Sequence, residues 1–292
     1  MSILVNKNTR VMVQGITGTQ ASFHVKLSME GGTNVVAGVN PHKGGSTYLG
    51  VPVFSTVAEA KEHTKADASL MFVPAYAVKE AAREAIEAEI GLVVCIAAGV
   101  PVLDMLEIRH MLEGSKTRFI GPNTPGIITP QEARLGIFPE NIHTKGCIGL
   151  VSSSSTLTYE AVIETNRAGL GQSTVIGLGD DMIIGTGFID IFKKFMDDDE
   201  TKAVVMVGGQ SWPYEDEGIE FYAALSKKKP LFGFIAGNEV PIKYNLGYAS
   251  DIMTNGVVTP QDKRQRMIDA GIIVVDNINF LHKELAHMFG NK

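Results

Sequence analysis

Short apolar runs rich in β-branched residues alternate with segments of helical pattern along most of this sequence, and glycine often follows the apolar runs. The run at 9–15 (TRVMVQG) precedes a helical segment at 21–32, and the run at 91–101 (GLVVCIAAGVP) is apolar almost throughout. A continuous apolar run predicts a strand that is covered on both faces, as in a parallel sheet. Strands that alternate with helices predict right-handed βαβ units. The pattern therefore predicts an α/β fold with doubly wound sheets.

The alternation is interrupted once, between Pro122 and Gly146, where four prolines accompany little helical periodicity. Such a segment is typical of a linker or of a rigid loop between domains. The alternation then resumes, and one later helix is expected to start with Pro260 at its first position. We therefore predict two doubly wound domains, at residues 1–121 and 147–292, with 122–146 as the interdomain segment.

Composition and charge argue against two classes of partner, nucleic acids and membranes. The net charge is −6 and no long basic run occurs, which argues against nucleic acid as a partner. No apolar run approaches the roughly 18–20 residues that span a membrane, and the opening stretch MSILVNKNTR lacks the apolar core of a secretory signal. Cys95 and Cys147 lie in apolar strand-like runs and are expected to be buried free thiols. Free thiols fit a reducing compartment, so a cytoplasmic location is expected.

The first strand-to-helix turn is GITGTQ, at 15–20. Glycines at this point let the backbone approach a phosphate at the N-terminus of the following helix, although a plain tight turn would use them as well. The spacing is G-x-x-G rather than G-x-G-x-x-G, and the second strand ends with His42 and Lys43 instead of an acid. A cation at that place suits a phosphate better than a ribose diol.

A cluster of hydroxyls, SSSST at 152–156, comes directly before a predicted helix in the second half. Hydroxyls and free N–H groups at a helix N-terminus can bind a carboxylate or a phosphate. The alternative is a helix cap with additional serines.

Several stretches together resemble the α-subunit family of succinyl-CoA synthetase. They are GITGTQASFH, GVNPHKGGSTYLGVPVFSTVAEA, IEAEIGLVVCIAAGVP, GPNTPGIITP, VSSSSTLTYEAV, GLGQS and FIAG. The resemblance covers nearly the whole chain in order. It implies an N-terminal Rossmann-like CoA-binding domain and a C-terminal flavodoxin-like domain of ligase type.

The resemblance also implies which residues bind the ligands. The residues that would contact coenzyme A are Gly18, Thr19 and Gln20 at its phosphates, Lys43 at the adenosine-phosphate end, and Val73, Pro74, Ala75, Ala97, Ala98 and Gly99 along its length. The residues that would bind a small carboxylic acid are Ser152, Ser153, Ser154, Ser155, Thr156 and Tyr159. The family reads S-R-S-G-T in this loop, so Ser153 and Ser155 are departures from its pattern. No metal ligand is expected in this chain.

The chain departs further from the family's pattern at the motif that relays phosphate. Its G-H-A-G motif, whose histidine carries phosphate, reads Gly247-Tyr248-Ala249-Ser250 here. A phenol with a pKa of about 10 is a poor relay group, so Tyr248 is expected to remain unphosphorylated, and it could simply fill the volume of the imidazole.

The supporting glutamate of the family is replaced by Gly209, and the nearby acids Glu215 and Asp216 are expected to be charges of a first helical turn rather than substitutes. His110, His282 and His287 are expected to be surface or core residues. His143 lies in the interdomain segment, and none of these four histidines is expected to replace the relay residue.

The resulting hypothesis is the alpha subunit of an NDP-forming acid–CoA ligase with an altered phosphoryl relay. A beta subunit with an ATP-grasp domain would supply ATP or GTP with Mg²⁺ in a hetero-oligomer. The alternative is a CoA-binding acyl or carbamoyl transferase subunit or a pseudoenzyme. The joint loss of the histidine and the glutamate favours the alternative, and the near-full-length resemblance favours the ligase.

Overall fold

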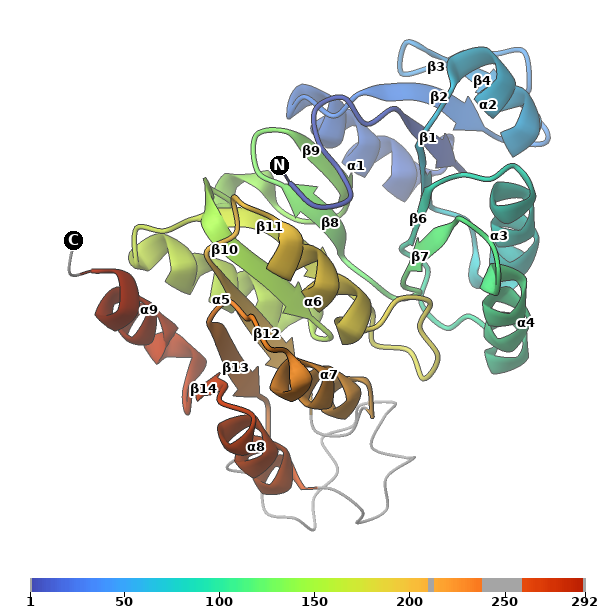
Figure 1. Cartoon of the computed structure of the whole chain (residues 1–292). Coiled ribbons are helices and arrows are strands. Elements are labelled where there is room, and N and C mark those ends of the chain that lie inside the picture. The colour runs from blue at the N-terminus through green and yellow to red at the C-terminus, as the bar shows by residue number, and fades with distance from the viewer. Residues whose placement is uncertain (1, 210–212, 238–258, 291–292) are drawn as a thin grey trace. The chain divides into compact units, whose positions relative to one another are not determined.

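The computed structural model describes residues 2–209, 213–237 and 259–290. The chain divides into two compact units (Figure 1). The N-terminal unit comprises Leu4–Phe138 and Ile183–Thr186, and the C-terminal unit comprises Met1–Ile3, Pro139–Met182 and Gly187–Lys292. The domain limits drawn from the sequence stay a prediction.

The N-terminal unit alternates strands and helices as predicted. Its elements are β1 (Val11–Gln14), α1 (Thr19–Glu30), β2 (Val35–Val39), β3 (Thr47–Tyr48), β4 (Val51–Phe54), α2 (Val57–Thr64), β5 (Ala68–Met71), η1 (Ala75–Ala77), α3 (Val78–Glu87), β6 (Leu92–Cys95), α4 (Val102–Leu112), β7 (Arg118–Ile120), β8 (Gly126–Thr129) and β9 (Ala133–Gly136).

The main sheet of this unit has the strand order β3-β4-β2-β1-β5-β6-β7. All neighbours pair in parallel except the short β3, which is antiparallel to β4. Without β3 the order is that of a Rossmann fold, which reverses its direction of winding between β1 and β5. The predicted Rossmann-like sheet is therefore confirmed, whereas the β3–β4 hairpin was not predicted.

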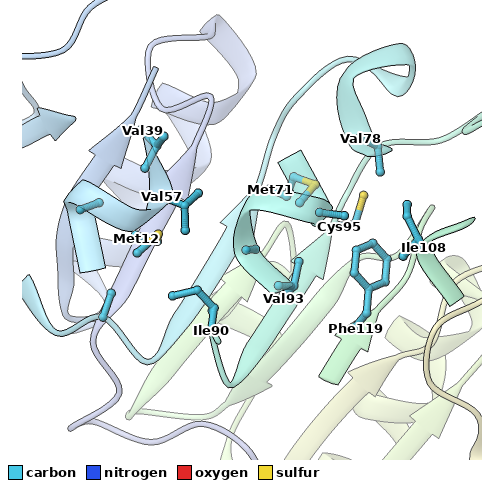
Figure 2. Packing of buried hydrophobic residues seen from close by; sticks show 14 of the residues in the cluster. Met12, Val39, Val57, Met71, Val78, Ile90, Val93, Cys95, Ile108 and Phe119 are labelled. Atoms are coloured by element: carbon cyan, nitrogen blue, oxygen red, sulfur yellow. The ribbon is translucent and has the colours of Figure 1, made fainter. Parts of the chain in front are cut away.

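An apolar core packs helices against this sheet. Figure 2 shows strand side chains such as Met12, Met71 and Val93 in one cluster with the helical residues Val78 and Ile108. Each is at most 1% exposed, and burying a side chain of this size contributes roughly 1.5–3 kcal/mol. The core fixes the strands, and with them the loops that follow their carboxyl ends.

The proline-rich segment holds more structure than a linker. β8 and β9 form an antiparallel hairpin in which Gly126 and Gly136 are partners. A Cβ atom on Gly126 would lie 2.0 Å from the Leu135 carbonyl oxygen. From β9, the buried Arg134 donates to Ser28 Oγ (2.9 Å) and to the His24 carbonyl oxygen (2.6 Å) on α1. The hairpin thus braces α1 by hydrogen bonds that the sequence did not reveal.

The C-terminal unit repeats the alternation. Its elements are η2 (Glu140–Ile142), β10 (Lys145–Ser152), α5 (Ser155–Arg167), β11 (Gln172–Gly177), α6 (Phe188–Asp197), β12 (Ala203–Gly208), α7 (Pro213–Ala224), β13 (Leu231–Ile235), α8 (Pro260–Asp269), β14 (Ile273–Val274), η4 (Ile278–Phe280) and α9 (Leu281–Phe289).

The five parallel strands of this unit run in the order β14-β13-β12-β10-β11. Numbered along the unit, this is the 2-1-3-4-5 order of flavodoxin, and it confirms the predicted flavodoxin-like domain. The winding changes direction between β10 and β12. The predicted start of α8 is also confirmed, because Thr259 caps the helix in a capping box and Pro260 follows.

Two further expectations concern single features. Cys95 is a buried free thiol as predicted, whereas Cys147 is only partly buried. Among the described helices, none is long and apolar enough to cross a membrane.

Candidate functional site

The first glycine loop lies between β1 and α1, at the point where the N-terminal sheet reverses its winding. Gly15 has φ +83°, and a Cβ atom there would lie 2.6 Å from the Phe72 carbonyl oxygen, so only glycine fits. Gly18 is the N-cap of α1 and provides no side-chain cap, and no acid stands in the first turn. The exposed Thr19 and Gln20 begin the helix. The free N–H groups of this turn can donate hydrogen bonds to an anion.

The loop after β2 is tied to this turn. Asn40, which follows β2, donates from Nδ2 to Thr17 Oγ1 at 2.8 Å. The Asn40 carbonyl oxygen also accepts the Lys43 N–H at 3.1 Å, and the Lys43 side chain is exposed. The structure therefore holds the backbone of the predicted phosphate-binding lysine beside the glycine loop.

The remaining predicted CoA contacts follow β5 and β6. Residues 73–75 come after β5, which is a neighbour of β1, and residues 97–99 come after β6, which is a neighbour of β5. Because these strands are parallel, the loops after β1, β2, β5 and β6 share the carboxyl edge of one sheet. This is the edge at which open α/β sheets bind ligands. The sequence-predicted residues of the N-terminal unit are thus brought to one edge.

An imidazole that the sequence analysis did not single out lies beside this edge. His24 on α1 is parallel to the Phe72 ring, with centroids 6.0 Å apart, and lies edge-on to Phe23 at 5.1 Å. Partial burial, together with the Arg134 guanidinium, lowers the pKa of His24 below its ordinary value. Both effects disfavour the imidazolium, so His24 is a neutral packing residue near neutral pH.

The hydroxyl loop of the C-terminal unit follows β10 at the second change of winding. Ser152 Oγ accepts the Ser154 N–H (3.0 Å) and donates to the Ser154 carbonyl oxygen (2.9 Å). Ser154 is the N-cap of α5, and its Oγ accepts the Leu157 N–H at 3.4 Å. The alternative reading of this loop as a helix cap is therefore correct for these two serines.

The next turn is open to a ligand. Ser155 and Thr156 are the first two residues of α5, they are not buried, and no acid stands in the first turn. Their N–H groups belong to the first turn, which has no partner within the helix. Tyr159 lies one turn further along α5, where partial burial raises the pKa of its phenol. An anion at this helix end would meet residues 155 and 156 rather than the whole serine run.

Below the hydroxyl loop lies a buried ion pair. Glu215, in the first turn of α7, is 0% exposed and its Oε2 accepts from Lys263 Nζ at 3.1 Å, with Lys263 itself 1% exposed. The Oε1 atom accepts Ser153 Oγ–H at 2.9 Å and the Gly209 N–H at 3.1 Å. Ser153 is thus bound to the protein interior instead of facing a substrate.

Two family models and several named proteins match this chain. A family model described as a CoA binding domain matches residues 6–99, and one described as CoA-ligase matches residues 151–273. The succinate–CoA ligase (ADP-forming) subunit alpha of Staphylococcus aureus strain N315 is 47% identical over 272 residues, which is 93% of this chain and 90% of that protein. Its counterpart in Staphylococcus epidermidis strain ATCC 12228 is 45% identical over 276 residues, 94% of this chain and 91% of that protein. The chain belongs to the succinate–CoA ligase alpha-subunit family.

Solved structures agree on the fold of this family member. The ATP citrate lyase of Methanothrix soehngenii, solved with citrate and coenzyme A, matches 99% of the chain with a TM-score of 0.87 at 21% identity. The chain covers only 50% of that lyase, and 50% of the Methanosaeta concilii lyase that matches with a TM-score of 0.88 at 22% identity. An acetyl-coenzyme A synthetase of Ca. Korarchaeum cryptofilum was solved with phosphate and ADP, and it matches with a TM-score of 0.77 at 17% identity. The match covers 98% of this chain and 61% of the synthetase chain.

Tyr248 and the segment 238–258 around it lie outside the described residues. Gly209, which the sequence analysis predicts to replace the family's supporting glutamate, is among the described residues, and its N–H donates to the Glu215 carboxylate. Both Glu215 and Asp216 do lie in the first turn of α7, but the burial and pairing of Glu215 were missed. Its partner Lys263 is 48 residues away, so no local pattern in the sequence could reveal the pair.

The four histidines that were possible replacements for the relay residue lie on the surface or in packing contacts. His110 is exposed beside Glu113 (3.5 Å), and His287 is exposed on α9. His282 Nδ1 lies 2.5 Å from Oε2 of the buried Glu164, which joins α9 to α5. His143 is 9% exposed, with its Nδ1 at 2.7 Å from the Pro139 carbonyl oxygen.

The sequence analysis predicted no metal ligand in this chain. Within residues 2–209, 213–237 and 259–290, no group of three or more His, Cys, Asp or Glu side chains could hold a metal ion.

Proposed function

We propose that this chain is the alpha subunit of an NDP-forming acid–CoA ligase that binds coenzyme A in its N-terminal unit. The observation that supports it most is that the loops after β1, β2, β5 and β6 share one sheet edge at a change of winding. Gly18, Thr19 and Gln20 meet the CoA phosphates, and Lys43 pairs with the phosphate at the adenosine end. Residues 73–75 and 97–99 line the rest of the ligand.

The acid substrate binds at the N-terminus of α5 in this proposal. The carboxylate, or the acyl phosphate made from it, is held by the first-turn N–H groups and the hydroxyls of Ser155 and Thr156, with Tyr159 one turn beyond. Ser152, Ser153 and Ser154 shape the loop through their hydrogen bonds to the protein. Because the named relatives are succinate–CoA ligases, succinate is the first acid to try.

The nucleotide comes from a partner. We assign ATP or GTP with Mg²⁺ to a beta subunit with an ATP-grasp domain, in a cytoplasmic hetero-oligomer. The acid carboxylate attacks the γ-phosphorus, the nucleoside diphosphate leaves, and an acyl phosphate forms. The CoA thiolate, having lost its proton to solvent, attacks the acyl carbonyl carbon, and inorganic phosphate leaves. Tyr248 takes no phosphate in this scheme, because its phenol is a poor nucleophile near neutral pH.

Calorimetry with the full chain tests the CoA-binding part of the proposal. Lys43→Ala should weaken CoA by about 5- to 30-fold, as expected for a lost charge-assisted hydrogen bond, and should leave dephospho-CoA nearly unchanged. Lys26→Ala is the matched control, since Lys26 is an exposed lysine of the same unit whose ion-pair partner is Glu30.

The outcomes separate the hypotheses. Equal loss of CoA and dephospho-CoA in the Lys43→Ala protein would contradict the role of Lys43. A folded wild-type chain that binds no CoA would overturn the proposed function. The competing transferase or pseudoenzyme function, which the joint replacements at positions 209 and 248 favour, predicts CoA binding without acid-dependent and ATP-dependent thioester formation in the presence of a competent beta subunit.

A further inference from the structure

The ion pair between Glu215 and Lys263 is almost completely buried. Its two side chains are 0% and 1% exposed, whereas at least one partner of Arg264–Asp276 and of Arg266–Asp216, nearby on the same helix α8, is well exposed. A buried pair loses the solvation of both charges, and often contributes less to stability than apolar side chains of similar size would. A buried pair at this place therefore calls for a role other than general stability.

The contacts of the pair indicate that role. One carboxylate oxygen accepts from Ser153, which follows β10, and from Gly209, which follows β12, while the other accepts from Lys263 on α8. β10 and β12 are the neighbouring strands between which the sheet changes its winding. One carboxylate thus joins both loops at the change of winding to a helix that comes later in the chain.

These hydrogen bonds fix the residue that precedes the N-cap of α5. The Ser153 side chain is held by Glu215 at 2.9 Å, and its N–H donates to the Val207 carbonyl oxygen at 3.1 Å. Ser154 then caps α5, and Ser155 begins it. Room for the carboxylate depends on Gly208, where a Cβ atom would lie 2.9 Å from Glu215 Cγ. Because Ser153 directly precedes the N-cap of α5, the direction in which the first-turn N–H groups point depends on where the Glu215 carboxylate is held.

We propose that Glu215, held by Lys263, is a positioning residue that sets the N-terminal turn of α5 for an anionic substrate. The inference rests on the proposed function, in which that turn binds the acid or its acyl phosphate. Groups that bind developing or bound charge work best when supporting contacts hold them in place before the ligand arrives. Glu215 acts on the ligand through Ser153 and the backbone, without touching it.

The test measures binding of inorganic phosphate to the full chain by ³¹P NMR titration, with CoA at saturation so that phosphate sites of the N-terminal unit are filled. Ser153→Ala removes one hydroxyl and leaves the ion pair intact, and it should weaken phosphate about three- to tenfold, the scale of one hydrogen bond. Glu215→Gln should weaken phosphate at least as much. The two changes should be non-additive, because Ser153→Ala removes the contact between Ser153 and residue 215 and Glu215→Gln weakens the same contact by removing its charge.

Two further variants separate positioning from general stability. Glu215→Gln removes the carboxylate charge that pairs with Lys263. The double variant Glu215→Gln with Lys263→Met keeps the test usable if the single variant does not fold. Asp198→Asn is the matched control, because Asp198 is a buried carboxylate of the same unit that binds Thr201 just before β12, at the opposite edge of the sheet. Asp198→Asn should lower the urea midpoint while phosphate affinity stays that of the wild type.

The contradicting outcomes are distinct. Wild-type phosphate affinity in a folded Ser153→Ala protein and in a folded Glu215 variant would overturn the positioning role and leave the proposed function intact. Absence of phosphate binding by the wild-type chain would overturn both this inference and the anion site of the proposed function. CoA affinity should be unchanged in all of these variants.

Discussion

At the scale of single residues, the informative positions are those at which a side chain has lost its ordinary environment. His24 is one of them, because partial burial and the Arg134 guanidinium hold its pKa below the ordinary value of 6.5. Well above pH 6.5 the imidazole is neutral in both the folded and the unfolded chain. Below that pH the unfolded chain binds the proton more readily, so protonation favours unfolding until the folded-state pKa is reached as well.

Between pH 7 and pH 5, the free energy of unfolding of the wild-type chain should therefore fall by about a few tenths of a kcal/mol more than that of a His24→Gln variant. The difference is small because the ring is partly exposed to solvent. Urea midpoints at both pH values measure this difference, and NMR titration of the His24 ring gives the pKa directly. A ring pKa at or above 6.5 would contradict the account.

Tyr248 and Gly209 form the second residue-scale prediction. Tyr248→His supplies an imidazole but no carboxylate to orient it, because Gly209 is predicted to stand at the family's glutamate position. The Glu215 carboxylate is already bound by Ser153 and Lys263. With a beta subunit and ATP, this single variant should show weak phosphorylation, and Tyr248→His with Gly209→Glu should show much more than the sum of the two single variants. Quantifying acid-labile phosphate on the 240–256 peptide tests the cycle. Full phosphorylation of the Tyr248→His variant alone would mean that Gly209 has no bearing on the relay.

At the scale of elements, the sequence revealed the two sheets but not all of their attachments. Continuous apolar runs and glycine-ended strands are local signals, so β1, β6 and the order of alternation could be predicted. The β8–β9 hairpin could not, because its prolines read as a loop and its bracing partner lies far away, in α1. The buried Glu215–Lys263 pair was hidden for the same reason, since burial of a charge is decided by residues that are distant in sequence. The predicted CoA residues, by contrast, follow strand ends and needed only the parallel topology.

The hairpin gives an element-scale prediction. Gly126 has φ +105°, and a Cβ atom there would overlap the Leu135 carbonyl oxygen of the partner strand. Gly45 has φ +81° with nothing within 4 Å of such an atom, so it carries the backbone strain without the collision. Gly126→Ala should therefore cost at least about 2 kcal/mol more free energy of unfolding than Gly45→Ala. Urea unfolding of the two variants measures this, and equal costs would show that strand β9 gives way without penalty.

At the scale of the whole molecule, the account is that one chain offers a CoA edge in its N-terminal unit and an anion-binding helix end in its C-terminal unit. Each site lies where its own sheet changes winding, which is a property of the two folds rather than of any one residue. The chain belongs to the succinate–CoA ligase alpha-subunit family, and we propose that it uses the two sites in one reaction. In the proposed scheme, Tyr248 stands where the family has its relay histidine, and this replacement changes how phosphate travels between nucleotide and acid.

The most direct test combines the chain with an ATP-grasp beta subunit, CoA, succinate, Mg²⁺ and ATP labelled at the γ-phosphate. The beta subunit is first shown to be active with an alpha subunit that carries the G-H-A-G motif. The account predicts succinate-dependent thioester formation with label in inorganic phosphate, and no acid-labile, base-stable phosphate on any histidine or on residues 240–256. Absence of thioester with the validated beta subunit, or acid-labile label on a histidine of this chain, would contradict it.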